Sequence, residues 1–210
     1  MKNNSSKQHW EEIYEVKDTT REVSWYQNNP KTSTDLILST GVDKDGSIID
    51  IGGGDSKLVD KLLGLSFKNI FVLDISARAL QKAKNRLGEK AELITWVDKD
   101  VLDFDTNSRF DIWHDRAAFH FLTKEEDIAR YVNIAEKLTK QNGHLIISTF
   151  SKNGPKKCSG LDITQYSENS IKKVFGKNFN HVRSFEEAHT TPFDTKQIFL
   201  WSIFKKSIKN

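Results

Sequence analysis

The sequence has few of the residues that define several specialised protein classes. It contains one cysteine, Cys158, so no disulfide can form within the chain, and a reducing compartment is expected. No apolar run approaches the length of a membrane-spanning helix. The opening residues, MKNNSSKQHW, contain no apolar segment of the kind found in secretory signals. We therefore expect a cytoplasmic protein without a membrane partner.

The chain also lacks an excess of one charge. Its 32 basic and 29 acidic residues give a net charge of +3 over 210 residues, and the two signs alternate along most of the chain. A basic stripe for nucleic acid is therefore not expected. The 6 histidines show no metal-ligand spacing, and with one cysteine no metal site is predicted. The 13 phenylalanines and 5 tryptophans supply enough large side chains for a core.

One stretch, Ser47–Leu63 (SIIDIGGGDSKLVDKLL), indicates a bound ligand. An apolar strand pattern ends at Ile51, three glycines follow, and a helical pattern begins near Ser56. A strand, a tight glycine turn and a helix are the opening of a nucleotide-binding α/β unit. Glycine lets the backbone adopt positive φ and approach a ligand closely.

Strands and helices alternate along the rest of the chain. Strand patterns are expected at Ser47–Ile51, Asn69–Ile75, Ala91–Val97, Arg109–Trp113, Gly143–Phe150, Phe179–Glu186 and Gln197–Lys205. Helical patterns are expected at Gln8–Val16, Ser33–Thr40, Ser56–Leu63, Ala77–Leu87, Thr123–Thr139 and Ser167–Gly176. This alternation predicts an α/β fold with a mostly parallel sheet and helices on both faces. Ligands of such sheets bind outside the carboxyl ends of the strands.

Several helix ends carry capping signals. Gly41 stands just after one predicted helix, where a left-handed residue closes the last turn. Ser76 and Ser167 precede helical patterns and are predicted N-caps. Thr123 and Glu126 have the spacing of a capping box.

The glycine turn departs from the dinucleotide fingerprint G-x-G-x-x-G. Gly52 and Gly54 fill the first two glycine positions, but Lys57 occupies the third. Asp50 and Asp55 bracket the turn and would repel a pyrophosphate. At a separation of about 5 Å and an effective dielectric constant near 20, each such pair would cost on the order of 3 kcal/mol. NAD is therefore disfavoured, and a P-loop is excluded because no Gly-Lys-Ser/Thr follows.

A positively charged nucleoside reverses the sign of this argument. S-adenosylmethionine has an ammonium, a sulfonium and a carboxylate, and it has no phosphate. Asp50 can attract the ammonium, while N–H groups of the turn meet the carboxylate. Asp74, at the end of a strand pattern, suits both ribose hydroxyls as a bidentate acceptor. Asp100, or Asp98 beside it, lies where an adenine amine needs an acceptor.

These motifs make the sequence similar to the class I S-adenosylmethionine-dependent methyltransferases. IIDIGGGDS resembles the first motif of that family, VLDIS its ribose-binding segment, and VDKDVLDF its adenine-side segment. The Asp-Arg in FDIWHDRAAFHFL is similar to thiopurine- and tellurite-resistance-type methyltransferases. The segment HWEEIYEVKDTTREVSWYQ also resembles a group of protein-lysine methyltransferases. The resemblance extends roughly from Trp10 to Phe204.

The resemblance implies a Rossmann-like seven-stranded sheet whose last strand is antiparallel. It also implies a set of cofactor contacts: Trp25, Asp50, Gly52, Gly54, Asp74, Ile75, Asp100, Val101 and His114. We expect two parts in the chain. Residues 1–30 would form an N-terminal helix and an aromatic segment, VSWYQ, that either packs on the core or covers the ligand. Residues 31–210 would form the cofactor-binding domain.

The reacting end is expected after Arg109–Trp113. Methyl transfer from a sulfonium depends mainly on positioning, and a base is needed only if the acceptor arrives protonated. His120 is the candidate base because its ordinary pKa is near neutrality, although a buried helix-face histidine is the alternative. Asp115 and Arg116 form either a structural ion pair or a catalytic pair, and Arg116 could hold an anionic group of the substrate. Cys158 is expected to be an ordinary loop residue.

The sequence thus predicts a methyltransferase that uses S-adenosylmethionine and acts on a small-molecule acceptor. The acceptor would be a thiol, metalloid or carboxylate compound. A protein-lysine methyltransferase is the alternative within the same chemistry. An NAD-dependent oxidoreductase and a non-catalytic cofactor-binding module are the alternatives of other classes. The oligomeric state stays open.

Overall fold

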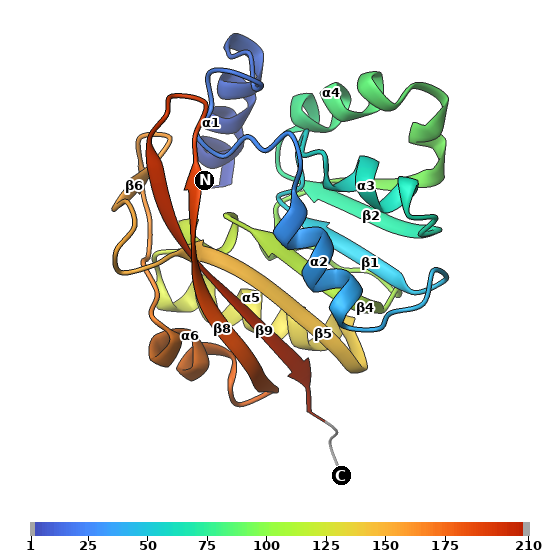
Figure 1. The fold of residues 1–210 in the computed structure, drawn as a ribbon, viewed down its shortest axis with the longest axis vertical. Coiled ribbons are helices and arrows are strands. Elements are labelled where there is room, and N and C mark those ends of the chain that lie inside the picture. The colour runs from blue at the N-terminus through green and yellow to red at the C-terminus, as the bar shows by residue number, and fades with distance from the viewer. Residues whose placement is uncertain (1–2, 208–210) are drawn as a thin grey trace.

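A computed structural model describes residues 3–207 and is built around one seven-stranded sheet (Figure 1). The strand order is β3-β2-β1-β4-β5-β9-β8. The strands are β1 (Ser47–Ile51), β2 (Asn69–Asp74), β3 (Ile94–Asp98), β4 (Phe110–Arg116), β5 (Thr139–Phe150), β8 (Phe179–Thr190) and β9 (Lys196–Lys206). Two short strands, β6 (Lys157–Cys158) and β7 (Leu161–Asp162), pair separately as an antiparallel hairpin.

Strands β1 to β5 pair in parallel, whereas β9 runs antiparallel to both β5 and β8. This arrangement confirms the predicted seven-stranded, mostly parallel sheet with an antiparallel last strand. The order of the strands also brings the carboxyl ends of β1, β2, β3 and β4 to one edge of the sheet, because parallel neighbours end on the same side.

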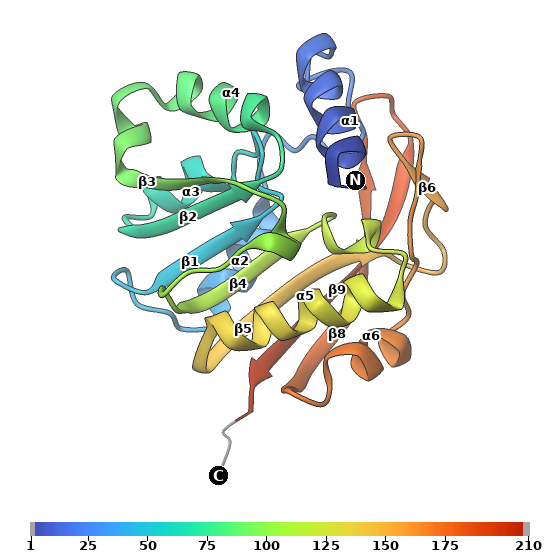
Figure 2. The same ribbon diagram turned by 180° about the vertical axis from the view of Figure 1, so that it is seen from behind.

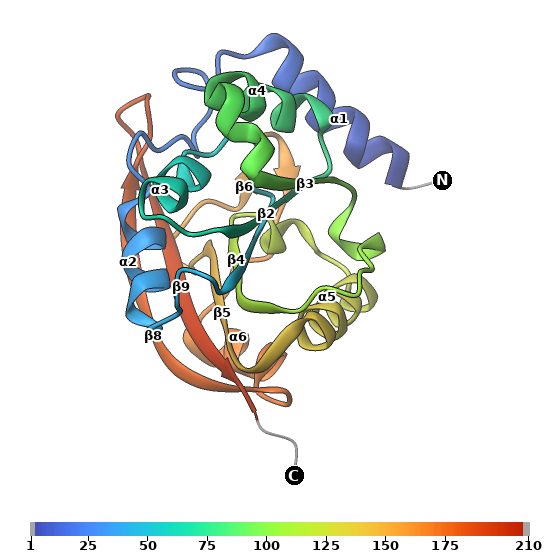
Figure 3. The ribbon, with the colours of Figure 1, turned by 90° about the vertical axis from the view of Figure 1, so that its right-hand side faces the viewer.

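Helices cover both faces of the sheet. They are α1 (Asn3–Val16), α2 (Lys31–Ser39), α3 (Leu58–Gly64), α4 (Ala77–Leu87), α5 (Glu125–Leu138) and α6 (Glu168–Phe175). Single 3-10 turns are η1 (Gly88–Leu93), η2 (Val101–Asp103) and η3 (Phe119–Phe121). Helix α2 lies in front of the sheet in Figure 1, and α5 and α6 lie in front of it in the opposite view of Figure 2. The side view in Figure 3 shows α2 and α3 on one side of the sheet and α5 on the other.

Two apolar cores fill the space between the helices and the sheet. Neighbouring strand residues point to opposite faces, so Ile48 and Ile112 enter the core under α2, α3 and α4. Ile49 and Trp113 enter the core under α5 and α6. Because both faces of these strands are buried, odd and even positions are both apolar, and the strands appear in the sequence as continuous apolar runs.

Three of the predicted helix caps are confirmed. Ser76 accepts a hydrogen bond from the backbone N–H of Ala79 at the start of α4. Ser167 caps α6 in a capping box. Gly41 follows α2 with φ of +73°, a left-handed conformation that favours glycine.

The capping box predicted at Thr123 and Glu126 is wrong. Helix α5 begins at Glu125, one residue later than that box requires, and its N-cap position is Lys124, which makes no side-chain capping bond. Acidic residues of the first turn, Glu125 to Asp127, face the positive end of the helix dipole instead.

Some element boundaries also differ from the prediction. The segment predicted as the start of β3 is the 3-10 turn η1, so β3 begins at Ile94. Strand β5 begins at Thr139 rather than Gly143, and its pairing with β4 is irregular near Asn142, which has φ of +62°. The irregularity lets β5 stay paired with β4 on both sides of Asn142 and Gly143. Asn-Gly is typical of turns, so local propensity alone did not predict that the strand starts before it. Helix α1 begins at Asn3, before the predicted Gln8.

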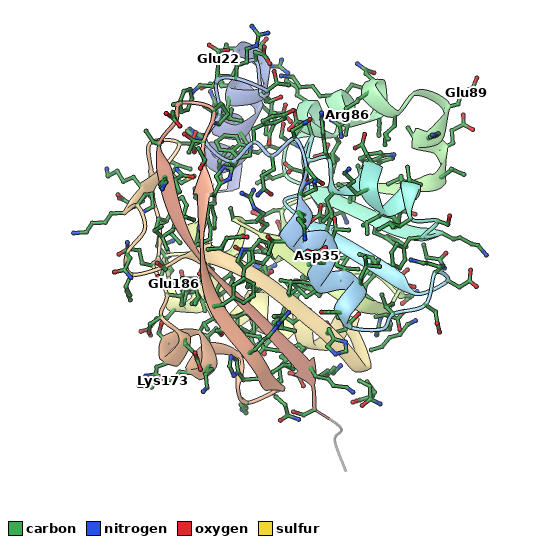
Figure 4. The ribbon with its side chains drawn as sticks, in the orientation of Figure 1. Glu22, Asp35, Arg86, Glu89, Lys173 and Glu186 are labelled. Carbon is green, nitrogen blue, oxygen red and sulfur yellow. The ribbon has the colours of Figure 1, made fainter. Side chains whose placement is uncertain are left out.

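Charged side chains of both signs lie around the periphery. In Figure 4, the labelled residues come from separate parts of the fold: Glu22, Asp35, Arg86, Glu89, Lys173 and Glu186. Within residues 3–207, no helix is both long and apolar enough to cross a membrane.

Candidate functional site

A cavity of about 180 Å³ lies at the carboxyl ends of the central strands. Its floor comes from the segments that follow β1, β2, β3 and β4, where the parallel register aligns Ile51 with Leu73 and with Asp115. Its cover comes from the N-terminal part of the chain, where α1 stands near this end of the sheet (Figures 1 and 2). The covering side chains include Trp10, Tyr14 and Trp25.

A smaller cavity of about 50 Å³ adjoins the first. The two cavities share four lining residues: Tyr14, Trp25, Gly52 and Arg116. Asp50, Asp55 and His114 line only the smaller cavity, whereas Asp74 and Asp100 line only the larger one. The acidic residues predicted at three strand ends therefore surround one continuous region.

The glycine turn lies so close to its neighbours that side chains would not fit. Gly52 has φ of +65°, and a Cβ there would stand 2.6 Å from Cβ of Ala118. Gly54 has φ of +47°, and a Cβ there would stand 2.8 Å from the hydroxyl oxygen of Tyr14 and 3.1 Å from Oδ2 of Asp74. The turn therefore needs glycine for its backbone conformation and for close approach.

Asp74 is only 6% exposed, and its carboxylate lines the larger cavity. Its Oδ1 accepts a hydrogen bond of 2.8 Å from the backbone N–H of Ser76. Burial raises the pKa of Asp74 to about 7, and the nearby charges of Asp55 and Asp50 act in the same direction. Its charge can therefore change near neutral pH.

Asp50 belongs to a buried chain of three polar side chains. Its Oδ1 lies 2.7 Å from Nδ1 of His114, and Nε2 of His114 lies 3.0 Å from the hydroxyl of Ser33. Asp50 and His114 are 4% and 1% exposed, so this chain is shielded from bulk water. The side chain of His114 thus positions Asp50, a role that the sequence did not indicate.

The remaining predicted cofactor residues lie around the larger cavity. Asp100 lines it and accepts a hydrogen bond from the backbone N–H of Leu102, and burial raises the pKa of Asp100. Ile75, Val101 and Trp25 also line it. Gly54 is the exception, since it lines neither cavity; a Cβ at this position would stand 2.8 Å from the hydroxyl oxygen of Tyr14.

Comparisons with known proteins agree with this geometry. Residues 49–145 match the methyltransferase domain family. An uncharacterized methyltransferase of Anoxybacillus flavithermus is 34% identical over 108 residues, which are 49% of this chain and 49% of the relative. Over residues 49–145 this chain is similar to methyltransferase domains. The match spans about half the length of this curated relative.

Solved structures show the same fold over nearly the whole chain. The N-methyltransferase NodS of Bradyrhizobium japonicum, in complex with S-adenosylhomocysteine, has a TM-score of 0.72 at 18% identity, covering 94% of this chain and 98% of NodS. A structure associated with conversion of a disulfide bond into a thioacetal group during echinomycin biosynthesis has a TM-score of 0.78 at 15% identity, covering 97% and 94%.

The residues of the methyltransferase domain fit its cofactor, S-adenosylmethionine. The glycine turn leaves no room for side chains, and Asp74 presents a buried carboxylate inside the cavity. The cofactor brings a methyl group that is already activated on a sulfonium. The chain itself has to bind, orient and shield the reactants. Within residues 3–207, no cluster of three or more His, Cys, Asp or Glu side chains could hold a metal ion.

Asp115 and Arg116 of the methyltransferase domain do not form the predicted ion pair. They are consecutive residues of β4, so their side chains leave opposite faces of the sheet. Asp115 accepts hydrogen bonds from the hydroxyl of Tyr131 (2.6 Å) and from the backbone N–H groups of Ala118 and Phe119. Burial raises the pKa of Asp115 to about 6. Asp115 thus braces the turn after β4, whereas Arg116 lines both cavities.

His120 lies outside both cavity linings and is 0% exposed. Its Nδ1 accepts a hydrogen bond of 3.2 Å from the backbone N–H of Phe150. Burial, together with the charge of Arg116, lowers the pKa of His120 to about 3, so its imidazole is neutral at physiological pH. His120 is therefore not proposed as the general base. Its placement agrees with the alternative of a buried histidine.

Several residues that line the larger cavity were not among the predicted site residues. Trp10 and Tyr14 stand four residues apart on α1, a spacing that places them on one helix face and could have indicated a shared role. Phe121 and Leu122 line the cavity from the turn after β4. Cys158, which was expected to be an ordinary loop residue, belongs to β6 and lines the cavity.

The Cys158 thiol is expected to react slowly with a disulfide reagent such as DTNB. Cys158 is 6% exposed, and burial raises its pKa to about 12. The thiolate, which is the reactive form, is therefore scarce at pH 8. We expect folded protein to react at least about 100-fold more slowly than protein in guanidinium chloride. Each unit by which the pKa is raised lowers the thiolate fraction about tenfold. Equal rates would show that this cavity wall opens freely.

Proposed function

We propose that this protein transfers the methyl group of S-adenosylmethionine to a small-molecule acceptor in the cytoplasm. The acceptor class is a thiol, metalloid or carboxylate compound. The observation that carries the proposal is the cavity at the strand ends, which Trp10, Tyr14 and Trp25 cover on the side of the N-terminal segment. A small cavity with a largely aromatic cover suits a small acceptor better than an extended polymer.

Residues 1–30 act in this proposal as a lid over the domain formed by residues 31–210. Both cavities are smaller than the roughly 300–1,000 Å³ of ordinary ligand pockets, so a nucleoside and an acceptor can enter only if the cover moves outward. The tethers of α1 are compatible with such movement. Exposed ion pairs join Arg78 of α4 to Glu11 and Glu15, and Lys7 to Asp98. Exposed pairs contribute only about 0–1 kcal/mol each.

The proposed cofactor contacts follow the lining of the two cavities. Asp74 accepts from the ribose hydroxyls, and Asp100 lies on the adenine side with Ile75 and Val101. Asp50 attracts the ammonium group from the smaller cavity, where His114 positions it. The N–H group of Gly52, which lines both cavities, meets the carboxylate, and Trp25 covers the methyl group.

Catalysis in this proposal comes from positioning. The histidine and carboxylate near the reacting end, His120 and Asp115, are buried and hydrogen-bonded away from the cavity. Arg116, the last residue of β4, carries a charged side chain that lines the cavity and can orient the acceptor. Holding two reactants in line contributes up to roughly 7–11 kcal/mol, which is sufficient for displacement at an activated methyl.

Two measurements test the proposal. Titration calorimetry with S-adenosylhomocysteine should give micromolar binding, and no binding would contradict the cofactor assignment. Cell extract incubated with protein and methyl-labelled S-adenosylmethionine should then yield a labelled small-molecule product that chromatography separates from S-adenosylmethionine itself. Asp74→Asn protein is the matched control and should form this product more slowly when S-adenosylmethionine is below saturation, in line with its weaker cofactor binding.

The same labelling experiment separates the two acceptor classes. Label in a protein band, with no labelled small-molecule product, would reject the small-molecule acceptor in favour of a protein-lysine methyltransferase. Binding of S-adenosylhomocysteine without a labelled product of either class would favour a non-catalytic cofactor-binding module.

A further inference from the structure

The charged side chain of Arg116 lines both cavities. Its Nη1 donates a hydrogen bond of 2.9 Å to the backbone carbonyl of Trp25, and its guanidinium lies 5.0 Å from the ring centroid of Phe199. Its Nη2 is buried and has no hydrogen-bond acceptor among the described residues. One edge of the guanidinium therefore has no protein partner within residues 3–207.

The acidic residues whose charges act on Arg116 are Glu187 and Asp50, and both already have other hydrogen-bond partners. Glu187 accepts hydrogen bonds from the hydroxyl of Thr32 and from Nε1 of Trp201. Asp50 is bonded to His114. Among residues 3–207, Arg116 forms no ion pair with either carboxylate, and its guanidinium contacts Trp25 and Phe199 instead. The charge of Arg116 is thus not neutralised by a direct carboxylate partner.

The side chain stays charged in spite of its surroundings. Burial lowers the pKa of Arg116 to about 10, which still leaves the guanidinium protonated at neutral pH. A buried charge without a counter-ion is unfavourable, and an anion that completes its hydrogen bonds stabilises it. The planar guanidinium fork suits a carboxylate in particular.

We propose that Arg116 binds a carboxylate group of the methyl acceptor. The acceptor class is then a small apolar or aromatic carboxylate, whose apolar part contacts Trp10 and Phe121 of the same cavity. This inference rests on the proposed function and narrows its acceptor class. It does not require the carboxylate to be the atom that receives the methyl group.

The position of Arg116 in the sheet favours the acceptor over the cofactor as the source of this anion. The glycine turn, Asp74 and Asp100 follow β1, β2 and β3, on one side of β4. Phe199, which packs against the guanidinium, comes from β9 on the other side. The cofactor carboxylate already has the N–H group of Gly52 as a partner in the proposed arrangement, so Arg116 is left for the second reactant.

Paired probes test this inference. Tryptophan fluorescence of protein saturated with S-adenosylhomocysteine is titrated with phenylacetate and phenylacetamide, and with cinnamate and cinnamamide. We expect each carboxylate to bind at least about 10-fold more tightly than its amide, corresponding to one charge-assisted hydrogen-bonded pair. Arg116→Met should abolish the difference, and Arg116→Lys should keep part of it. No preference for the carboxylates in the parent protein would overturn the inference.

A matched control removes a similar charge elsewhere in the cavity. Lys99 lines the larger cavity after β3, so Lys99→Met should leave the carboxylate preference unchanged. An equal loss in both variants would show a general electrostatic effect and would overturn the assignment to Arg116.

The cofactor arm of the experiment distinguishes the two sources of the anion. Calorimetry should show that Arg116→Met changes the affinity for S-adenosylhomocysteine by less than about 3-fold. A loss of 10-fold or more, with the probe preference unchanged, would assign Arg116 to the cofactor carboxylate and overturn the inference. Failure of the parent protein to bind S-adenosylhomocysteine would contradict the proposed function itself, whatever the carboxylate probes show.

Discussion

Replacing Asp74 with asparagine is expected to weaken binding of S-adenosylhomocysteine by about 30-fold at pH 8. The carboxylate lies inside the larger cavity and is the proposed acceptor for two ribose hydroxyls. Hydrogen bonds to a charged acceptor contribute about 1.5–3 kcal/mol, and 2 kcal/mol corresponds to about 30-fold. Titration calorimetry of both proteins at several pH values measures the loss.

The pH dependence gives this prediction a second readout. The pKa of Asp74 is about 7 in the free protein, so its carboxyl group is mostly ionised at pH 8 and mostly protonated at pH 6. The affinity of the parent protein should therefore fall as the pH is lowered through 7. The affinity of Asp74→Asn should stay nearly constant over the same range. Parallel pH profiles for the two proteins would contradict the role of Asp74.

The raised pKa also predicts how stability changes with pH. Because the folded-state pKa of Asp74 lies above the unfolded value of about 3.9, folding favours the protonated form. The contribution of this group to stability is fully present below about pH 4 and is lost as the pH rises through 7. Thermal unfolding of the free proteins should show that Asp74→Asn lacks this component.

A neighbouring acid supplies the control for these measurements. Asp98 is the register partner of Asp74 on β3, but its side chain is exposed and pairs with Lys7. Asp98→Asn makes the same chemical change outside both cavity linings. We expect it to change the affinity for S-adenosylhomocysteine by less than about 2-fold, in keeping with the small contribution of exposed pairs.

Replacing His114 with alanine is expected to lower the free energy of unfolding by about 3 kcal/mol. The substitution removes an imidazole that is 1% exposed and leaves the carboxylate of Asp50 and the hydroxyl of Ser33 without that partner. Loss of one partner from a buried, charged hydrogen-bonded pair typically costs about 3–5 kcal/mol. Urea unfolding measures the change. His144→Ala, at a half-buried histidine of β5, is the control and should cost less than about 1 kcal/mol.

A double-mutant cycle tests whether the effect comes from the pair with Asp50. Asp50→Asn, His114→Ala and the double variant are compared with the parent protein. We expect the two losses to be non-additive by about 1 kcal/mol or more, because the second substitution removes a group that already lacks its partner. Additive losses would show that the two side chains stabilise the fold independently.

The sequence by itself determined the architecture and the edge of the sheet at which the cavity lies. Apolar runs of strand length alternate with amphipathic segments, and this pattern specifies parallel strands with helices on both faces. The turn at Gly52 and Gly54 could be predicted from the sequence because glycine readily adopts positive φ and has no side chain that would clash with a close neighbour. Asp50 and Asp74 could be placed at one edge because parallel strands end there together.

Only the tertiary structure decided how each polar residue near the site is used. His120 and Arg116 stand four residues apart in the sequence, yet one is enclosed against Phe150 and the other lines both cavities. Their pKa values depend on burial and on neighbouring charges, which are set by the packing of distant elements.

The cover of the cavity shows the same limit. Trp10 and Tyr14 belong to a helix that is far from the glycine turn in the chain, and Cys158 belongs to a separate hairpin. Local periodicity indicates that such residues belong to a helix or a loop, but it contains no information on which distant surface they contact. The sequence therefore determined the binding edge and the class of cofactor, while long-range packing decided the walls of the cavity and the unpaired guanidinium within it.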